Sequence, residues 1–484
     1  DVFISQDGQT YHYLINNANF ESYIKVVKVD AETGKTIPYA GAGFQIYDPA
    51  GNKVSMTFTY PTPTTIDTFY TDADGQLVTP EKLEYGKGYS LVEVQAPYGY
   101  VLDSTPVSFD VTEENSTQEG GITLIKVDKP NMAQKGTISV EKTGEVFFGV
   151  NVSGEEDKDV IYQPVYTVKG LAGAVYEITA DEDIITPDGT LRYHKGDVVD
   201  TVTTDDEGFA KSKELYLGKY TVVETKAPTG MVINNEKHSV ELTYAGQDVA
   251  VTETATSFYN ERQKVKIFLE KILKQNETFG IGKNDEIKNI SFGLYAKEDI
   301  VSSSGTAIPA DGLIEIITLD ENGVATANTD LPFGSYYVKE IATDEHYILS
   351  DTQYPFTFEY AGQDTETVEI KVNDGKPIEN KFIYGSVSGK KIDENGEALS
   401  GALIGIFKAD ETVFTKEHAI MTAVSQKDGS FSFAKVPYGN WIVREIEAPT
   451  GFVLDDTSYE VNISESGQVV EVAITNEYIH GNIQ

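Results

Sequence analysis

The chain has 484 residues, of which 40% are apolar and 11% aromatic, and it contains no cysteine. This length is too great for a single hydrophobic core and predicts several folded domains. The lack of cysteine excludes disulfides, thiolate metal sites and cysteine nucleophiles. A formal net charge of −39 repels phosphate backbones and anionic lipids, so we expect no nucleic-acid partner, and no apolar run has the length of a membrane span.

Residues 1–19 precede the first complete repeat and include the stretch "YLINNANF". Asn17 lies eleven residues before Lys28, a spacing that recurs twice later in the chain, from Asn260 to Lys271 and from Asn380 to Lys391. We therefore expect this segment to be the last strand of a preceding unit and the chain to be a slice of a longer array.

From residue 20 onward one order of strands and turns occurs four times, and we call each occurrence a module. The modules are residues 20–132, 133–262 with an insertion at 145–168, 263–383, and 384–484 with the start of a linker. Short runs of alternating apolar residues, punctuated by Gly, Asp and Asn, predict an all-β fold.

Each module opens with a strand that carries one lysine on its apolar face. In "IKVVKVD" this residue is Lys28, which follows Ile24 and Val26 at even spacing. The equivalent residues of the later modules are Lys142, Lys271 and Lys391. A single lysine near a strand end is usually a surface residue, but four in the same phase favour a shared role.

A glutamate occupies the apolar face of a middle strand in each module. In "YTVVETKAPTG" Tyr220, Val222 and Glu224 share one face, and the equivalents of Glu224 are Glu93, Glu340 and Glu445. A buried, unpaired carboxylate costs several kcal/mol, so each glutamate needs a partner or a chemical role. Ala-Pro follows three of these strands, but module 3 has "ATDEH", which predicts a different turn there.

Each module closes with an Asp or Asn at the end of its last strand. Asn260, Asn380 and Asn476 each follow an apolar residue two positions earlier. In module 1 the stretch "LIKVDKPN" offers two candidates. We assign the position to Asp128, which is chemically competent, and Asn131 is the competing assignment.

A lysine, a glutamate and an Asx side chain that meet in one apolar core can form an amide bond. Desolvation lowers the pKa of a buried amine and raises that of a buried carboxyl. The amine is then a nucleophile, and the acid polarises the Asx carbonyl and passes a proton to the leaving group. The predicted links are Lys28–Asp128 with loss of water, and Lys142–Asn260, Lys271–Asn380 and Lys391–Asn476 with loss of ammonia. Such a reaction occurs once per module, so the chain is not expected to be an enzyme.

The combined pattern "K-x-D … AGA-F … T-D-x-x-G … E-x-x-A-P-x-G-Y … N" resembles the Cna B-type domain, the SpaA-like module of pilins and adhesins of Gram-positive bacteria. The resemblance covers nearly the whole chain in four copies. It implies an all-β tandem array of four transthyretin-like β-sandwiches with reverse immunoglobulin topology. It also implies that a self-formed isopeptide bond joins the first and last strands of a module.

The leading functional hypothesis is a stalk or pilus segment on the cell-wall-attached, extracellular surface of a Gram-positive bacterium, whose partners are neighbouring modules. The alternative is an adhesin in which the insertion of module 2 binds a host or matrix ligand. An exposed aromatic patch there would support binding, whereas strands packed on a sandwich would not. A third possibility, a secreted hydrolase, requires an acidic cleft in one module only, whereas the glutamate recurs in all four.

No cofactor or metal is expected. The Asp-Gly turns lack the downstream bidentate glutamate of a calcium loop, and Asp-Gly is common in hairpins. The histidines have no ligand spacing and are interpreted as surface or loop residues; they are His12, His194, His238, His346, His418 and His480.

Overall fold

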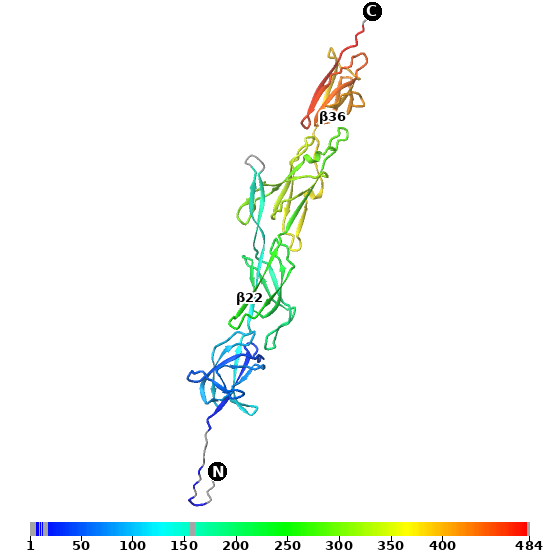
Figure 1. The fold of residues 1–484 in the computed structure, drawn as a ribbon. Coiled ribbons are helices and arrows are strands. Elements are labelled where there is room, and N and C mark those ends of the chain that lie inside the picture. The colour runs from blue at the N-terminus through cyan, green and yellow to red at the C-terminus, as the bar shows by residue number, and fades with distance from the viewer. Residues whose placement is uncertain (1–5, 9, 11, 13–17, 155–159, 482–484) are drawn as a thin grey trace. The chain divides into compact units, whose positions relative to one another are not determined.

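The computed structural model describes residues 6–8, 10, 12, 18–154 and 160–481, and these form β-strands with two short 3-10 turns (Figure 1). The strand end predicted at Asn17 lies outside the described residues. Contacts divide the chain into two compact units, residues 1–144 with 168–261 and residues 145–167 with 262–484. Within the described ranges no helix has the length and apolarity that crossing a membrane needs.

Module 1 is a sandwich of two sheets. One sheet has the strand order β10-β11-β1-β6, with β7 also paired to β1, and the other has the order β5-β2-β8-β9. The strands are β1 (Glu21–Asp30), β2 (Gly43–Tyr47), β3 (Met56–Phe58), β4 (Thr64–Ile66), β5 (Phe69–Tyr70), β6 (Gln76–Val78), β7 (Leu83–Glu84), β8 (Gly86–Gln95), β9 (Val107–Val111), β10 (Ser116–Glu119) and β11 (Ile122–Asn131). Strands β3 and β4 pair only with each other.

Module 2 repeats this plan. Strands β18, β19 and β22 all pair with β12, and the opposite sheet has the order β17-β14-β20-β21. The strands are β12 (Lys135–Ser153), β13 (Ile161–Gly170), β14 (Val175–Ala180), β15 (Ile184–Ile185), β16 (Leu191–Tyr193), β17 (Val198–Thr203), β18 (Phe209–Lys211), β19 (Leu215–Tyr216), β20 (Gly218–Lys226), β21 (Lys237–Leu242) and β22 (Val251–Asn260).

Module 3 has a first sheet of β28, β23 and β31, with β32 also paired to β23, and a second that contains β27-β24-β29-β30. Its last strand is interrupted by a 3-10 turn, η2 (Val372–Gly375). The other elements are β23 (Lys264–Ile272), η1 (Glu286–Asn289), β24 (Ser291–Ala296), β25 (Ile300–Val301), β26 (Ala307–Ile308), β27 (Leu313–Thr318), β28 (Val324–Ala327), β29 (Gly334–Ala342), β30 (Gln353–Phe358), β31 (Thr367–Lys371) and β32 (Ile378–Glu379).

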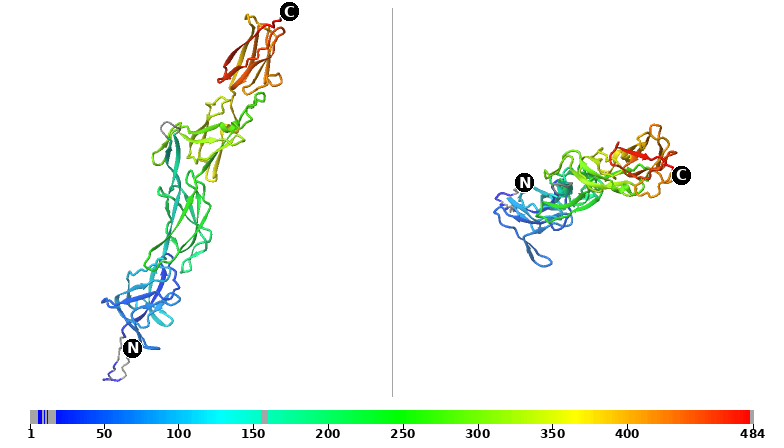
Figure 2. Two further views of the ribbon diagram at one scale, coloured as in Figure 1. Left: turned by 45° about the horizontal axis from the view of Figure 1, so that its top comes forward. Right: turned by 90° about the horizontal axis from the view of Figure 1, so that it is seen from above.

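Module 4 consists of a three-stranded sheet, β36-β33-β39, and a four-stranded sheet, β35-β34-β37-β38. Figure 2 shows this module in orange and red. Its strands are β33 (Tyr384–Asp393), β34 (Leu403–Lys408), β35 (Met421–Val424), β36 (Ser430–Pro437), β37 (Gly439–Glu447), β38 (Tyr459–Ile463) and β39 (Val469–Asn476).

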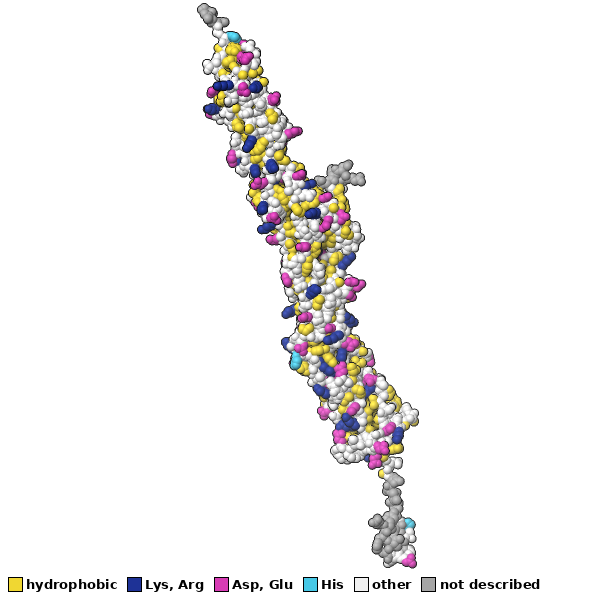
Figure 3. Space-filling view, turned by 180° about the vertical axis from the view of Figure 1, so that it is seen from behind, with side chains coloured by type: hydrophobic (Ala, Val, Ile, Leu, Met, Phe, Trp, Pro, Cys, Tyr) yellow, Lys and Arg dark blue, Asp and Glu magenta, His cyan; other side chains and the backbone are white. Residues whose placement is uncertain are grey.

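Alternation of side chains explains why each module forms a sandwich. On β1 the side chains of Ile24, Val26 and Lys28 are fully buried, and they share one face. Each module has its own cluster of buried apolar side chains between its sheets. On the face shown in Figure 3, acidic and basic side chains are interspersed over the surface. The modules are therefore distinguished by their separate hydrophobic cores and not by patches of one charge on this face.

The insertion predicted in module 2 packs against module 3. Phe147, Val150 and Tyr162 contact the apolar core of module 3, and β13 pairs in parallel with β27 at Ile161 and Leu313. The guanidinium of Arg262 stacks on the Tyr166 ring at 3.7 Å from its centroid. The insertion therefore extends a strand pair onto a sandwich, which is the arrangement expected of a structural segment.

A loop of module 3 likewise enters the core of module 4. Phe279 and Ile281 lie between β23 and η1 and are buried among side chains of module 4. The rings of Phe279 and Trp441 meet edge to face, with centroids 4.9 Å apart, a favoured aromatic geometry. Modules 3 and 4 thus share part of one apolar cluster.

We predict that Phe279→Ala lowers the free energy of unfolding of module 4 by about 3 kcal/mol, because it leaves a cavity beside Trp441. Trp441 is the only tryptophan of the chain, so its fluorescence reports on this module alone, and its emission should shift to longer wavelength. Tyr60→Ala, which alters a side chain that is 87% exposed, serves as the control. Unchanged emission and an unchanged denaturation midpoint in Phe279→Ala would contradict this packing.

Candidate functional site

The first and last strands of each module lie side by side in parallel, and this pairing places a lysine near an asparagine. In module 4 Lys391 on β33 is opposite Ile474 on β39, and Asn476 follows two residues later. In module 2 Lys142 is opposite Phe258, and Asn260 again follows by two. Because alternate residues of a strand share a face, the asparagine side chain enters the same core as the lysine.

A hairpin turn that ends in glycine fixes the backbone at each lysine. The N–H of Lys142 donates to the carbonyl of Gly208 at 2.7 Å, and the same bond joins Lys28 to Gly75, Lys271 to Gly323 and Lys391 to Gly429. Gly208 has φ of +86°, and a Cβ there would lie 2.3 Å from the Lys142 carbonyl oxygen. Only glycine fits this approach, so the turn serves to position the lysine strand.

The glutamates come from the opposite sheet. Glu224 on β20 faces Tyr176 on β14, and Glu93 on β8 faces Phe44 on β2. A shift of register lies directly beside both pairs, and modules 3 and 4 have the same irregularity at Glu340 and Glu445. Each carboxylate therefore points across the sandwich toward the lysine.

Lysine, glutamate and asparagine form one buried contact in each module. The lysine Nζ lies 2.9, 3.0, 3.2 and 3.2 Å from a glutamate oxygen in modules 1 to 4. The asparagine Nδ2 donates to the same carboxylate at 2.7, 3.0, 2.8 and 2.7 Å. In modules 2 and 3 the lysine also donates to the asparagine Oδ1. None of these twelve side chains is more than 2% exposed; they are Lys28, Glu93, Asn131, Lys142, Glu224, Asn260, Lys271, Glu340, Asn380, Lys391, Glu445 and Asn476.

The loop after each glutamate returns to hold its carboxylate. The backbone N–H ten residues later donates to a carboxylate oxygen, as from Asp103 to Glu93 at 3.2 Å and from Asp455 to Glu445 at 2.9 Å. Asn234 and Ser350 make the same contact in modules 2 and 3. A fixed loop therefore orients each acid, although the sequence patterns had not pointed to this contact.

The structure does not bring Asp128, the predicted acceptor of module 1, to Lys28 and Glu93, and Asn131 lies there in its place. Its carboxylate is about half exposed and pairs with Lys126 at 3.0 Å. Asn131 is 1% exposed, and its amide contacts Glu93. Asp128 lies on the outward face of β11, whereas Val127, Lys129 and Asn131 point inward.

Two features of the sequence explain why Asn131 and not Asp128 lies at the site. Asn131 lies eleven residues before Lys142, the same spacing that joins Asn260 to Lys271, and this regularity identifies Asn131. The apolar residue expected two positions before the acceptor is replaced by Lys129, which obscured the pattern. Lys129 is 1% exposed, and its ammonium pairs with Asp103 at 3.0 Å, so a buried lysine occupies an apolar position.

The "ATDEH" stretch predicted a different turn after Glu340 in module 3, but the backbone turn is close to that of the other modules. The N–H of Tyr347 donates to the carbonyl of Asp344 at 3.0 Å, as that of Tyr100 does to Pro97 at 3.1 Å. Asp344 takes the place of the proline and accepts hydrogen bonds from Asn289 and His346. The backbone turn is thus retained, and only the side chains that stabilise it have changed.

Burial sets the electrostatics of the four lysines. Desolvation lowers the pKa of Lys28 to about 8, against the opposing attraction of Glu93. Desolvation also lowers the pKa of Lys142, Lys271 and Lys391. A buried lysine next to a carboxylate thus has a larger neutral fraction than a solvated one, which is what a nucleophilic amine requires.

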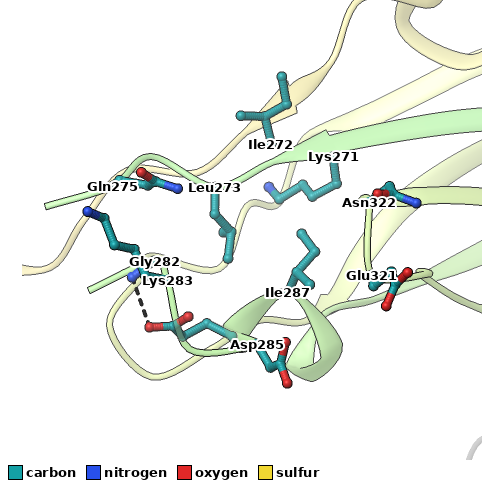
Figure 4. A pocket seen from close by; sticks show the side chains of 11 residues that line it. Lys271, Ile272, Leu273, Gln275, Gly282, Lys283, Asp285, Ile287, Glu321 and Asn322 are labelled. Atoms are coloured by element: carbon teal, nitrogen blue, oxygen red, sulfur yellow. Dashed lines mark hydrogen bonds between the residues drawn. The ribbon is translucent and has the colours of Figure 1, made fainter. Parts of the chain in front are cut away.

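A pocket of about 330 Å³ lies beside Lys271 in module 3, between the loop after β23 and the hairpin turn at Glu321 (Figure 4). Its buried acid, Glu286, accepts backbone N–H groups from Gly282 and Asn284, and its neighbour Asp285 pairs with Lys288 at 2.9 Å. These acids brace the loop. Across the described ranges, no group of three or more His, Asp or Glu has metal-binding geometry.

The two-sheet modules and the recurring lysine, glutamate and asparagine define a class of tandem β-sandwich proteins with a buried polar site in each module. The SpaA prealbumin-like fold domain family matches residues 22–126, 164–256, 275–376 and 385–478. The chain belongs to this family, which confirms the predicted fold class of four β-sandwiches in tandem.

One solved structure agrees with this fold, and two pilins match part of the chain at lower TM-scores. The Bacillus anthracis TIE protein is similar over 96% of this chain and 76% of its own, at 17% identity and a TM-score of 0.52. BcpA, the major pilin subunit of Bacillus cereus, matches 72% of this chain and all of its own at 16% identity and a TM-score of 0.30. The major pilin SpaD from Corynebacterium diphtheriae matches 72% of this chain and 98% of its own at 15% identity and a TM-score of 0.19. A comparison with curated proteins finds no match.

The lowered pKa of Lys28 predicts how the stability of module 1 depends on pH when Asn131→Ala prevents any link. The unfolded lysine binds its proton up to about pH 10.5, but the folded one releases it near pH 8. Because the unfolded state binds more protons in this window, stability rises with pH. We expect about 2 kcal/mol of added stability from pH 8 to pH 10, measured by pulse proteolysis of module 1 in urea.

The matched control for this measurement is Asn131→Ala combined with Lys28→Met. Removal of the titrating amine should flatten the dependence on pH between pH 8 and pH 10. An equal rise in both variants would show that another group causes it.

Proposed function

We propose that the chain is a load-bearing stalk or pilus segment in which each module forms an intramolecular isopeptide bond between its first and last strands. The observation that carries this proposal is the fourfold buried contact of lysine, glutamate and asparagine at the end of paired parallel strands. The proposed bonds are Lys28–Asn131, Lys142–Asn260, Lys271–Asn380 and Lys391–Asn476.

The reaction uses only the three side chains. The neutral lysine Nζ attacks the asparagine Cγ, so an Nζ–Cγ bond forms and the Cγ–Nδ2 bond breaks. The glutamate lies within hydrogen-bond distance of both nitrogens, and it carries one proton from Nζ to Nδ2, which leaves as ammonia. Folding holds the reactants in contact, and such proximity contributes roughly 7–11 kcal/mol of the barrier.

Unsatisfied polar atoms favour a bonded arrangement in modules 1 and 4. Seven buried side-chain polar atoms of the described residues have no hydrogen-bond partner, and five belong to these two sites. They are Glu93 Oε1, Asn131 Oδ1, Lys391 Nζ, Glu445 Oε1 and Asn476 Oδ1. Glu93 Oε1 still pairs with Lys28, and Lys391 Nζ with Glu445 Oε1, so the two asparagine Oδ1 atoms are the ones without a polar contact. Each of these two carbonyl oxygens costs about 1–3 kcal/mol when left unpaired. In the linked form the glutamate keeps a proton that it can donate to this oxygen, whereas the carboxylate of the unlinked ion pair has none to give.

A bond between the first and last strands suits a protein under tension. Pulling force would pass from one terminal strand to the other through the amide and would not unzip the sandwich. The bond also removes loop-closure entropy from the unfolded chain, as a disulfide does, by about 4–5 kcal/mol for a loop of ~100 residues. The chain has no cysteine, so a redox-independent link would supply the covalent reinforcement.

We place this segment on the cell-wall-attached, extracellular surface of a Gram-positive bacterium. The family assignment supports this placement, as do the names of the similar pilins from Bacillus cereus and Corynebacterium diphtheriae. In the segment predicted as an adhesive insertion, the carbonyls of Phe147 and Phe148 accept N–H groups from Ser303 and Ser304 of module 3. This packing favours a structural role for the insertion over a binding one.

Stretching of single molecules tests the mechanical proposal. In the wild-type chain no module should lengthen on pulling, because each bond bypasses the sequence between its two ends. Glu224→Ala removes the proton carrier of module 2 and frees the 118 residues from Lys142 to Asn260, which adds one extension step of about 400 Å. A wild-type chain that already shows four steps of this kind would contradict the proposal. Glu253→Ala, an exposed change in the same module, is the control.

A further inference from the structure

The side-chain amide nitrogen of Asn380 donates to a second acceptor, which comes from a position where the other three modules have alanine. In module 3 its Nδ2 donates to Glu340 at 2.8 Å and also to the hydroxyl of Thr343 at 2.9 Å. Thr343 lies three residues after Glu340, where the other modules have Ala96, Ala227 and Ala448. It belongs to the "ATDEH" stretch, in which module 3 lacks the Ala-Pro sequence of the other three modules.

In modules 1 and 4 a backbone carbonyl is the second acceptor of the asparagine amide. Nδ2 of Asn131 donates to the Val101 carbonyl, and Nδ2 of Asn476 donates to the Val453 carbonyl, both at 2.5 Å. Each carbonyl lies eight residues after the glutamate of its module. An acceptor other than glutamate therefore holds the amide nitrogen in three of the four modules, but its chemical nature differs.

We propose that Thr343 is a positioning residue for isopeptide formation in module 3, in which its hydroxyl replaces the loop carbonyl that holds the leaving nitrogen elsewhere. This inference rests on the proposed function. Bond formation gives Nδ2 a third hydrogen as it departs, so an acceptor at 2.9 Å stabilises the departing ammonia more than the starting amide. Interactions that strengthen toward the transition state raise the rate.

The test compares the wild-type chain with three variants of the full chain in a time course. The chain is made by cell-free translation, samples are denatured at intervals, and the Lys271–Asn380 and Lys142–Asn260 peptides are quantified by mass spectrometry. The rate of the Lys142–Asn260 link serves as an internal reference, or clock, within the same chain. Thr343→Val, which keeps the shape but loses the acceptor, should slow the Lys271–Asn380 link roughly tenfold or more relative to that clock. Thr343→Ser should restore the wild-type rate, and Thr326→Val, an exposed change in the same module, should have no effect.

Two further readouts separate positioning from loss of structure. The first readout is the rate of Lys271–Asn380 link formation as a function of pH. Thr343→Val should lower the maximal rate reached at high pH, but the pH at which the rate is half-maximal, which Lys271 sets, should not change. A midpoint displaced to higher pH would indicate a loosened core and overturn the proposal. In a Glu340→Ala background, which forms no link in module 3, Thr343→Val should lower the melting temperature by only a few degrees, as expected for one lost hydrogen bond, and loss of cooperative unfolding would show a disrupted core and overturn the proposal.

Failure of this inference differs from failure of the proposed function. If the wild-type chain forms no link in any module, the proposed function is wrong. If it forms all links and Thr343→Val keeps pace with the clock, or Thr343→Ser is as slow as Thr343→Val, only the role of the Thr343 hydroxyl is overturned.

Discussion

Parallel pairing of the first and last strands is the constraint on which the rest of each module depends. In a parallel pair, residues two apart along neighbouring strands point into the same core. That register brings an asparagine on β22 or β39 next to a lysine on β12 or β33. The opposite sheet then supplies the acid, and the hairpin glycine and the loop N–H fix the two strands that carry the amine and the carboxylate.

Burial raises the free energy of the separate lysine and glutamate side chains, and it also makes the lysine, glutamate and asparagine reactive toward one another. Removing a lysine and a carboxylate from water carries a penalty of several kcal/mol per ion, which their attraction only partly offsets. Amide formation turns the ionisable amine into a neutral amide and leaves the glutamate in the core with a proton, so both buried charges disappear and much of that cost with them. The same desolvation that lowers the lysine pKa therefore drives the proposed reaction and is relieved by it.

The sequence predicts much of this architecture because alternation of apolar residues is strong on the lysine and glutamate strands. Lys28 and Glu93 follow apolar neighbours at even spacing, and both are fully buried. The sequence pattern favoured Asp128 over Asn131 because Lys129 interrupts the apolar alternation before Asn131, although the spacing from Asn131 to Lys142 matches that of the other modules. Docking of the insertion on module 3 could not be predicted, since it depends on a tertiary partner more than a hundred residues away. Thr343 escaped notice because its role is visible only once Asn380 is placed beside it.

The most direct test of the central claim is the mass of the intact chain after full denaturation, followed by mapping of the linked peptides. Four Lys–Asn bonds predict a mass lower than the sequence value by four molecules of ammonia, with Asn131 and not Asp128 joined to Lys28. Loss of three ammonia molecules and one water, with Asp128 linked, would contradict the assignment in module 1. A mass equal to the sequence value would contradict the covalent account altogether.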